Sequence, residues 1–286
     1  MRELVRFTGK SLISMGVLVL LFVGYQLWGT GLAQARDQQA LRSTLEQTLG
    51  PSTAAAPAAP VAPPDLGQAV ALLQIPKISV EQAVIEGVGI EDLKKGPGRY
   101  PDTPMPGEPG NAAIAGHRTT YGAPFFRLDE LKVGDPITVT TRAGRFRYEV
   151  SESKVVSPES IDVLDPTDDA RLTLTTCNPR YSAAQRLIVV SRLVGRAIDP
   201  PPNAPPPRPP TSLSEVEERA GLSGKAAAKE PALYSGALAA LVWLATWLVA
   251  RSWSRPWAAY LIGAPVFFVI LFVFFENVAR LLPANI

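Results

Sequence analysis

Three uncharged apolar stretches constrain the fold of this chain more than any other feature of its sequence. Residues 11–33, 232–250 and 257–275 contain no Asp, Glu, Lys or Arg. At about 1.5 Å rise per residue, each stretch is long enough to cross a hydrocarbon core of roughly 30 Å as a helix. The composition agrees, because 47% hydrophobic and 19% charged residues make the chain more apolar than a soluble protein usually is. We therefore predict three transmembrane helices.

Each of these predictions has an alternative. The first stretch follows a basic segment and ends near GLAQA (31–35), so a cleaved signal peptide is the alternative there. The second and third stretches could instead form a helical hairpin inside a soluble core. Their unbroken apolarity and the flanking Trp253 and Trp257 favour the membrane.

Basic residues predict how the three helices are oriented. Arg2, Arg6 and Lys10 precede the first helix, and Arg251 and Arg255 lie between the second and the third. Positively charged segments stay in the cytoplasm, and a chain that starts inside and crosses twice is inside again at that loop. The sequence thus predicts a multi-pass protein of the cell membrane whose middle part is extracytoplasmic.

Composition divides the extracytoplasmic part into linkers and one folded domain. Residues 51–65 are rich in Ala and Pro, and residues 199–212 are rich in Pro; such segments stay extended and build no core. The predicted segments are a cytoplasmic tail (1–10), a transmembrane helix (11–33), a stalk with an Ala/Pro linker (34–67), a folded domain (68–197), a Pro-rich linker (198–231), a second transmembrane helix (232–250), a cytoplasmic loop (251–256), a third transmembrane helix (257–275) and an extracytoplasmic tail (276–286).

Short β-branched or alternating apolar runs, separated by Gly, Pro, Asp and Asn, fill the predicted domain. They lie at 71–89, 111–117, 136–141, 145–157, 171–177 and 186–195. This pattern predicts an all-β fold, either a barrel or a sandwich. Short helices are predicted at 124–132 and 90–96.

The chain holds one cysteine and one histidine, and each ends a strand-like run. Cys177 ends RLTLTTC, and His117 ends NAAIAGH. A lone residue of either type is often only structural, but a thiol nucleophile needs a partner such as histidine to handle its proton. An unpaired thiol outside the cytoplasm also has no intramolecular disulfide to make. The pair predicts a cysteine–histidine catalytic site, with a structural pair as the alternative.

Strand geometry adds an arginine to this site. Side chains alternate along a strand, so Cys177 points away from the face that carries the leucines of RLTLTTC. An antiparallel return of the next run brings Arg186 close to Cys177. Arg118 and Arg180 are the alternatives for an arginine that assists the cysteine. Arg186 is preferred because a strand holds it in place.

The same sequence excludes several other kinds of site. A structural zinc site needs about four Cys or His ligands, and this chain has two such residues. No glycine-rich phosphate loop follows a strand, and a net charge of +2 gives no basic surface for nucleic acid. No metal, cofactor or nucleic acid is predicted.

Joined together, these motifs resemble the sortase family, the cysteine transpeptidases of Gram-positive surfaces. TLTTC (173–177) is followed by Arg186 nine residues after the cysteine, and AGHR (115–118) places its histidine sixty residues before it. The resemblance covers about residues 71–195 and implies an eight-stranded β-barrel. The catalytic residues that it implies are Cys177, His117 and Arg186.

Residues 96–118 and the Ala/Pro linker are most similar to the class E sortases of actinobacteria. Those enzymes favour a Leu-Ala-x-Thr-Gly sorting signal, and Tyr100 stands where they place a tyrosine that contacts it. Thr176 and Asn178, which flank the cysteine, are predicted to bind substrate together with Tyr100. The chain departs from the common family pattern in two ways. Sortases usually have one membrane anchor, and this chain is predicted to have attachments at both ends. Some sortases bind calcium, which takes about six to eight oxygens, through acidic loops near the histidine, whereas 101–110 offers only Asp102 and Glu108.

The resemblance implies a membrane-anchored enzyme that cleaves a Thr-Gly bond in an LPxTG-like or LAxTG-like sorting signal. Cys177 would form a thioester acyl-enzyme, and the protein would be transferred to the amine of a lipid-linked cell-wall precursor. The implied partners are surface proteins with C-terminal sorting signals, that precursor and the membrane. The alternatives are another extracytoplasmic thiol peptidase or transpeptidase, a pilus-polymerising sortase, and a non-catalytic envelope binding module.

Overall fold

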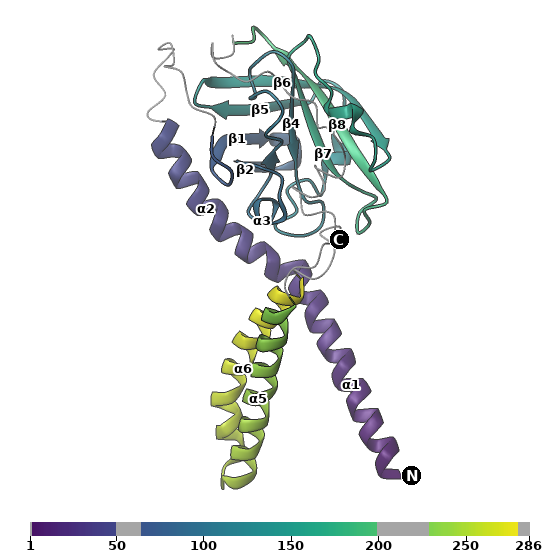
Figure 1. Ribbon diagram of the computed structural model, residues 1–286, viewed down its shortest axis with the longest axis vertical. Helices are drawn as coiled ribbons and strands as arrows, with labels where there is room; N and C mark the ends of the chain where they lie inside the picture. Colours follow the sequence, from purple (N-terminus) through teal and green to yellow (C-terminus); the bar gives the residue numbers. More distant parts are fainter. Residues whose placement is uncertain (1, 50–63, 199–228, 280–286) are drawn as a thin grey trace. The chain divides into compact units, whose positions relative to one another are not determined.

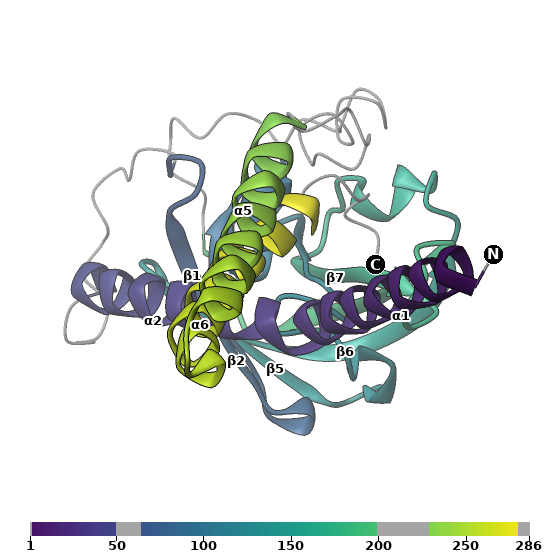
Figure 2. The same cartoon turned by 90° about the horizontal axis from the view of Figure 1, so that it is seen from below.

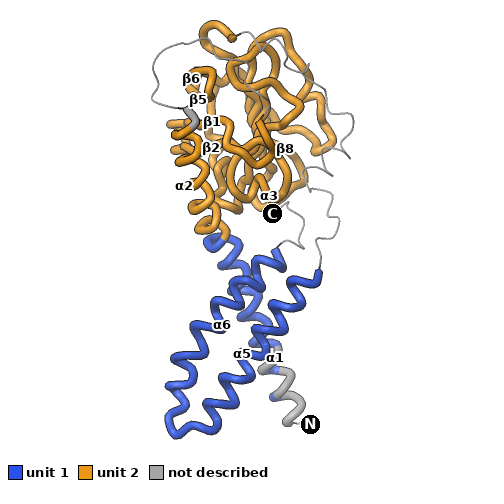
Figure 3. The backbone as a smooth tube through the Cα atoms, turned by 60° about the vertical axis from the view of Figure 1, so that its left-hand side comes forward, with its two compact units in different colours: residues 1–29, 224–284 blue, residues 30–223, 285–286 orange. Residues whose placement is uncertain are grey.

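The computed structural model describes residues 2–49, 64–198 and 229–279. The chain divides into two compact units, which Figure 3 colours blue and orange. One unit contains the N-terminal helix and the C-terminal helical hairpin, and the other contains a β-barrel with the helix that precedes it. The apolar helices and the barrel are therefore separate compact parts of the chain.

The first unit contains helices that are long and apolar enough to cross a membrane, as the sequence predicts. Helix α1 continues into a short π-helix, η1. Helices α5 and α6 form a hairpin and lie side by side in both views of the ribbon (Figures 1 and 2). The bounds are α1 (Arg2–Gly24), η1 (Tyr25–Gly29), α5 (Glu230–Ser252) and α6 (Pro256–Ala279).

Aromatic and polar contacts hold this helical unit together. Tyr25 packs edge-on against Phe272 of α6, with ring centroids 5.0 Å apart. The Asn277 side chain donates a hydrogen bond to Ser235 Oγ at 3.3 Å and so joins α6 to α5. In an apolar surrounding, such a polar contact between helices stabilises their packing by roughly 0.5–2 kcal/mol.

The second unit is a closed barrel with the strand order β1-β2-β3-β4-β7-β8-β6-β5. The all-β, eight-stranded barrel with short helices that the resemblance implies is thus confirmed. The strands are β1 (Ala69–Ile75), β2 (Val80–Glu86), β3 (Gly98–Arg99), β4 (Asn111–Ala115), β5 (Pro136–Thr141), β6 (Gly144–Val156), β7 (Arg171–Asn178) and β8 (Gln185–Val194). The short helices are η2 (Pro76–Ile78), α3 (Ile90–Leu93), η3 (Leu128–Glu130) and η4 (Ile161–Leu164).

Alternating apolar side chains fill the interior of the barrel. In β5, Ile137 and Val139 are fully buried while the residues between and before them are partly exposed. Leu73, Ile114 and Leu174 join the same core from three other strands. This alternation is expected where one face of each strand packs on a core, and it holds the strand ends in fixed positions.

The short helix predicted over 124–132 is confirmed only in part, because the structure has only the 3-residue 3-10 helix η3 in that segment. Phe125 and Leu128 are fully buried in the barrel core. The Phe125 N–H donates to the His117 carbonyl oxygen at 3.1 Å. Contacts with the barrel therefore determine the backbone here in place of a regular helix.

Helix α2 (Thr30–Leu49) belongs to the same compact unit as the barrel and lies along β1 and β2 (Figure 1). The sequence predicts a stalk and linker over 34–67, of which residues 50–63 lie outside the described part of the chain. Most of the predicted linker 198–231 also lies outside it. The predicted tail 276–286 begins inside α6, and its remainder is not among the described residues.

Candidate active site

Strands β7 and β8 bring Cys177 and Arg186 together. The two strands are antiparallel, and Cys177 lies directly opposite Arg186 in their register. Cys177 is a free, partly exposed cysteine and lies outside the core cluster that contains Leu172 and Leu174. The sheet therefore holds the thiol rigidly at a strand end while leaving it accessible.

A parallel pairing of β4 with β7, which the sequence does not predict, brings His117 to the same place. The ladder continues past the end of β4, because the Gly116 N–H donates to the Thr175 carbonyl oxygen at 3.1 Å. The Thr176 hydroxyl donates back to the Gly116 carbonyl oxygen at 2.8 Å. His117 follows immediately and so lies at the end of β7 that carries Cys177.

The His117 ring is buried next to an aromatic neighbour. Its exposed fraction is 9%, and its centroid lies 5.1 Å from that of the Tyr121 ring. Nε2 has no hydrogen-bond partner among the described residues. Two effects lower the pKa of His117 to about 4: burial, which is the larger, and the charge of Lys94. The imidazole is therefore neutral at neutral pH and can accept a proton.

The thiol of Cys177 is also neutral at rest. Burial raises the pKa of Cys177, and the guanidinium groups of Arg186 and Arg118 oppose this rise. With a raised thiol pKa and a lowered imidazole pKa, the pair holds one proton over a wide pH range. The two nearby cations stabilise the thiolate that forms when this proton moves to His117.

Arg186 is anchored at the start of β8. Its Nη1 donates to the carbonyl oxygens of Ala183 at 3.0 Å and Gln185 at 3.1 Å. The charge of Arg186 acts on both Cys177 and Tyr100, since it lowers the pKa of each against the opposing effect of burial. The guanidinium therefore lies near both the sulfur and a predicted substrate contact.

Arg118 forms hydrogen bonds to the end of β7 at Cys177 and Asn178. Its Nη1 donates to the Cys177 carbonyl oxygen at 3.1 Å and to Asn178 Oδ1 at 2.7 Å. Its side chain is 4% exposed and forms an ion pair with Asp129 at 3.1 Å. Because Arg118 lies in the loop that follows β4, these contacts attach that loop to the end of β7.

Arg180 contacts a different part of the barrel. Its Nη2 forms an ion pair with Asp129 at 3.0 Å, and its Nε donates to the Phe126 carbonyl oxygen at 3.2 Å. The guanidinium also lies 4.4 Å from the centroid of the Phe126 ring. Arg180 thus links the β7–β8 connection to η3 and to the segment before it.

Tyr100 lies beside the strand that carries the nucleophile. A hydrogen bond joins its side chain to that of Thr175, and burial raises the pKa of Tyr100. Tyr100 also packs with Val88 and Ala115 in a small cluster next to the main core. Tyr100 lies between β3 and β4, and the substrate contact that the resemblance implies for it stays a prediction.

Asn178 and Thr176 flank the cysteine in different surroundings. Asn178 is partly exposed, and its Nδ2 donates to Gln185 Oε1 at 3.2 Å. Thr176 is buried, and its hydroxyl already donates a hydrogen bond to the Gly116 carbonyl oxygen. The contacts of Thr176 therefore suit holding the end of β4 better than contacting a peptide.

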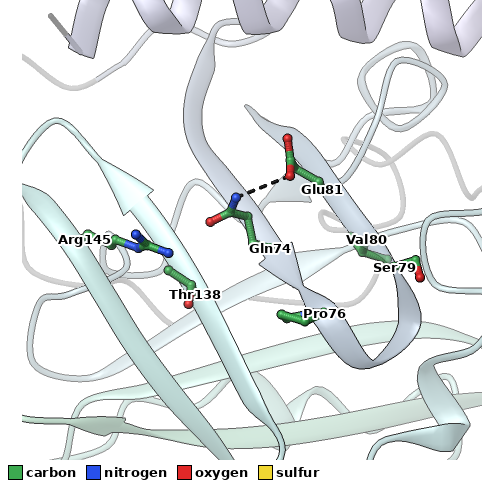
Figure 4. Close-up of a pocket in the computed structure, with 7 residues that line it drawn as sticks. All are labelled: Gln74, Pro76, Ser79, Val80, Glu81, Thr138 and Arg145. Atoms are coloured by element: carbon green, nitrogen blue, oxygen red, sulfur yellow. Dashed lines mark hydrogen bonds between the residues drawn. The ribbon is translucent and has the colours of Figure 1, made fainter. Parts of the chain in front are cut away.

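A hollow on another part of the barrel contains none of these residues. It is lined by β1, β2, β5 and β6, and Gln74 donates a hydrogen bond to Glu81 at 3.4 Å on one wall, with Arg145 on another (Figure 4). Its lining includes no cysteine or histidine. It therefore lacks the cysteine–histidine pair on which the candidate site depends.

Comparison with known proteins finds that this chain is similar to sortases. The model of the family described as "Sortase domain" matches residues 73–194. Sortase SrtE1 of Streptomyces coelicolor is 36% identical over 206 residues, which cover 66% of this chain. Sortase SrtE2 of the same organism is 30% identical over 216 residues, which cover 67% of this chain and 83% of SrtE2. A solved sortase D5 transpeptidase of Clostridium perfringens has a TM-score of 0.49 and 31% identity, covering 56% of this chain and 99% of its own.

The closed barrel therefore carries a cysteine, a histidine and an arginine at neighbouring strand ends. Together with the family match and the similarity to SrtE2, it shows that the chain belongs to the sortase family. The similarity to SrtE1 and SrtE2 supports the predicted likeness to class E. The chain spans 57% of the length of SrtE1.

Proposed function

We propose that this sortase is a membrane-anchored cysteine transpeptidase that joins surface proteins to a cell-wall precursor. It cleaves the Thr-Gly bond of an LPxTG-like or LAxTG-like sorting signal and transfers the new carboxyl end to an amine. The observation that carries the proposal is the pairing of Cys177 with Arg186 at the end of β7, beside His117 at the end of β4.

The first half of the proposed reaction makes a thioester. The Cys177 sulfur passes its proton to His117 and attacks the carbonyl carbon of the threonine. The carbonyl electron pair moves onto oxygen, where the planar donors of Arg186 stabilise the charge. When that pair returns, the bond to the glycine nitrogen breaks, and the imidazolium of His117 donates its proton to the departing amine.

The second half transfers the acyl group. The precursor amine attacks the thioester carbonyl, and the now neutral His117 accepts the proton of that amine. The carbon–sulfur bond breaks, and Cys177 leaves as a thiolate that takes this proton back from the imidazolium of His117. A histidine with a pKa of about 4 suits this cycle, because it is neutral at the start of both halves.

The predicted substrate contacts receive different roles in this proposal. Tyr100 and Asn178 contact the sorting signal on either side of Cys177. Thr176 positions His117 through its hydrogen bond to the Gly116 carbonyl. Arg118 positions Cys177 through the backbone.

The proposal is tested by incubating the full chain in detergent with a panel of fluorogenic sorting-signal peptides, with and without an amine acceptor. We expect cleavage of a Leu-Ala-x-Thr-Gly peptide and an amide product when the amine is present. Hydrolysis without amide product at any amine concentration would favour the thiol peptidase alternative. Cleavage of no peptide, with a Cys177 that resists thiol reagents at neutral pH, would favour a binding module.

Arginine substitutions separate the proposed oxyanion donor from its neighbour. Arg186→Ala is expected to lower kcat/KM at least about 10²-fold, the scale for losing one oxyanion donor. Arg180→Ala is the matched control and should have a far smaller effect, because Arg180 contacts Asp129 and Phe126. Steady-state kinetics on the cleaved peptide measures both. A larger loss in Arg180→Ala would contradict the role given to Arg186.

We also propose a membrane topology with a cytoplasmic amino terminus, an external barrel, a cytoplasmic loop at 251–256 and an external carboxyl terminus. The support is that three described helices are apolar and long enough to cross and that Arg251 and Arg255 lie at the α5–α6 turn. Positive charges at such a turn favour the cytoplasmic side.

Cysteine labelling in a Cys177→Ala background tests this topology. Ser252→Cys is expected to be protected from an impermeant thiol reagent in intact cells, whereas Asn285→Cys is expected to react. Permeabilised cells are the control, since both positions should then be labelled. Reaction of Ser252→Cys without reaction of Asn285→Cys in intact cells would mean that the orientation is inverted or the first helix is cleaved.

A further inference from the structure

Helix α2 contacts the barrel through polar side chains at every fourth position, which lie on one face of a helix. Thr30, Gln34, Gln38 and Arg42 each form a hydrogen bond to the barrel or its loops. The first three are almost fully buried. Glutamine is mostly an exposed residue unless its amide is hydrogen-bonded. This face of α2 is therefore matched to the surface on which it lies.

Gln38 completes the edge of strand β2. Its Oε1 accepts a hydrogen bond from the Ala83 N–H at 2.8 Å, and its Nε2 donates to the carbonyl oxygens of Ala83 at 3.0 Å and Lys95 at 2.9 Å. A Cβ at Gly96 would clash with this amide. The side chain thus pairs with the backbone of β2 as a neighbouring strand would.

The start of α2 contacts the loop that follows β4. The Tyr121 N–H donates to Thr30 Oγ1 at 3.2 Å. A Cβ at Gly122 would clash with Gln34 Oε1, and Gln34 is itself held by a 2.8 Å hydrogen bond from its Nε2 to Gln82 Oε1. Two side chains of α2 therefore brace this loop.

The braced loop has a backbone that needs support. Tyr121, Gly122 and Ala123 have φ angles of 49°, 72° and 45°, in the left-handed region that residues other than glycine adopt where their surroundings hold them. This backbone places the Tyr121 ring on His117, with centroids 5.1 Å apart. A chain of contacts thus runs from α2 through Tyr121 to the proposed acid and base.

We propose that Thr30 and Gln34 of α2 are positioning residues for His117 and act through Tyr121. They hold the loop so that the Tyr121 ring covers the imidazole and fixes its orientation at the end of β4. This inference rests on the proposed function, because His117 is the acid and base there. It gives α2 a role in the reaction in addition to joining the barrel to the preceding helix.

A helix that only stabilises the barrel would behave differently. Gln38 and Arg42 attach the same helix to β2, away from the Tyr121 loop. If α2 is only a structural support, weakening any of its contacts lowers the Tm and leaves the His117 ring unchanged. If α2 positions His117, contacts at its start change the behaviour of that ring selectively.

The single histidine of this chain makes the test direct. Histidine-selective ¹³C labelling of the full chain in detergent, purified without a histidine tag, gives one imidazole to titrate. Thr30→Val removes the acceptor for Tyr121 and keeps the side-chain shape, whereas Thr30→Ser keeps the hydroxyl. For Thr30→Val we expect the titration midpoint to rise by at least about half a pH unit toward the ordinary histidine value of about 6.5.

Kinetics on the cleaved peptide gives the second readout. For Thr30→Val we expect kcat to fall about 3–10-fold with little change in KM, because a misplaced general base slows the chemistry more than binding. Thr30→Ser should resemble the wild type in both measurements. Lys94, whose charge also acts on His117, is unchanged in all variants.

Arg42→Ala is the matched control on the same helix. It breaks the 3.1 Å ion pair with Glu81 and is expected to leave the His117 titration unchanged. If Thr30→Val does not fold, Gln34→Asn, which withdraws an amide from Gly122, is measured in its place. An unchanged titration in the folded variant, or an equal shift in Arg42→Ala, would overturn the proposal. The titration needs no peptide, so this result is independent of whether the proposed sorting-signal substrate is right.

Discussion

Replacing Cys177 with alanine is expected to abolish peptide cleavage while the barrel stays folded. Without a nucleophile no thioester forms, and losses of about 10⁴-fold or more in kcat are usual for such a change. Cys177 is partly exposed and lies outside the core cluster, so we expect the free energy of unfolding to change by less than about 1 kcal/mol. Peptide cleavage and thermal unfolding of the full chain measure the two effects.

A matched control for this experiment is Ser182→Ala in the β7–β8 connection, which leaves the thiol in place and should retain cleavage. If Cys177→Ala keeps more than a small fraction of wild-type cleavage, the nucleophile is a different residue. If Cys177→Ala unfolds the barrel, the thiol is a structural residue, which is the alternative reading of the lone cysteine.

The second large effect is expected for His117→Ala, which should lower kcat/KM at least about 10²-fold, the usual scale for losing a general acid and base. The pH dependence gives an independent check. The pair of Cys177 and His117 is active with one proton, so wild-type kcat/KM should fall as the pH drops through the His117 pKa of about 4 and the pair gains a second proton. The alkaline limb reflects loss of the remaining proton, at the raised pKa of Cys177.

His117→Ala should therefore lose the acid limb of the profile as well as rate. Thr119→Ala, two residues along the same loop, is the control and should keep both. A His117→Ala variant with wild-type rate and an unchanged acid limb would show that another group handles the proton.

Strand periodicity made most of the barrel predictable from the sequence. Seven of the eight strands overlap runs of alternating or β-branched residues, and β5 matches its predicted range of 136–141. Strand β3 could not be predicted, because its two residues, Gly98 and Arg99, are too few to show a period. The helix expected at 124–132 is reduced to η3, because burial of Phe125 and Leu128 in the core outweighs the local helical preference.

The candidate site was only partly predictable. Lone residues at two strand ends and a hairpin return led to Cys177, His117 and Arg186 without knowledge of the topology. The parallel pairing of β4 with β7 is a long-range contact that leaves no local signal, so the sequence could not show how His117 reaches Cys177.

The positioning roles of Arg118 and of the glutamines of α2 could not be predicted from the sequence either. Arg118 appeared in the sequence as a rival of Arg186, and only its contacts with the Cys177 carbonyl and Asp129 show that it supports the backbone. Gln34 and Gln38 are polar residues in a polar helix, which predicts solvent exposure. They can be buried because two glycines distant in sequence have no side chain to clash with them: Gly96 lies against Gln38, and Gly122 lies against Gln34.

The central claim is that Cys177 carries the acyl group, and intact mass measurement of the full chain tests it most directly. The chain is mixed with excess sorting-signal peptide without an amine and is acidified within the first turnovers. We predict an added mass equal to the peptide ending at its threonine less one water, located on Cys177, removed by hydroxylamine and absent in Cys177→Ala. Cleavage of the peptide with no such adduct, or an adduct on another residue, would contradict the account.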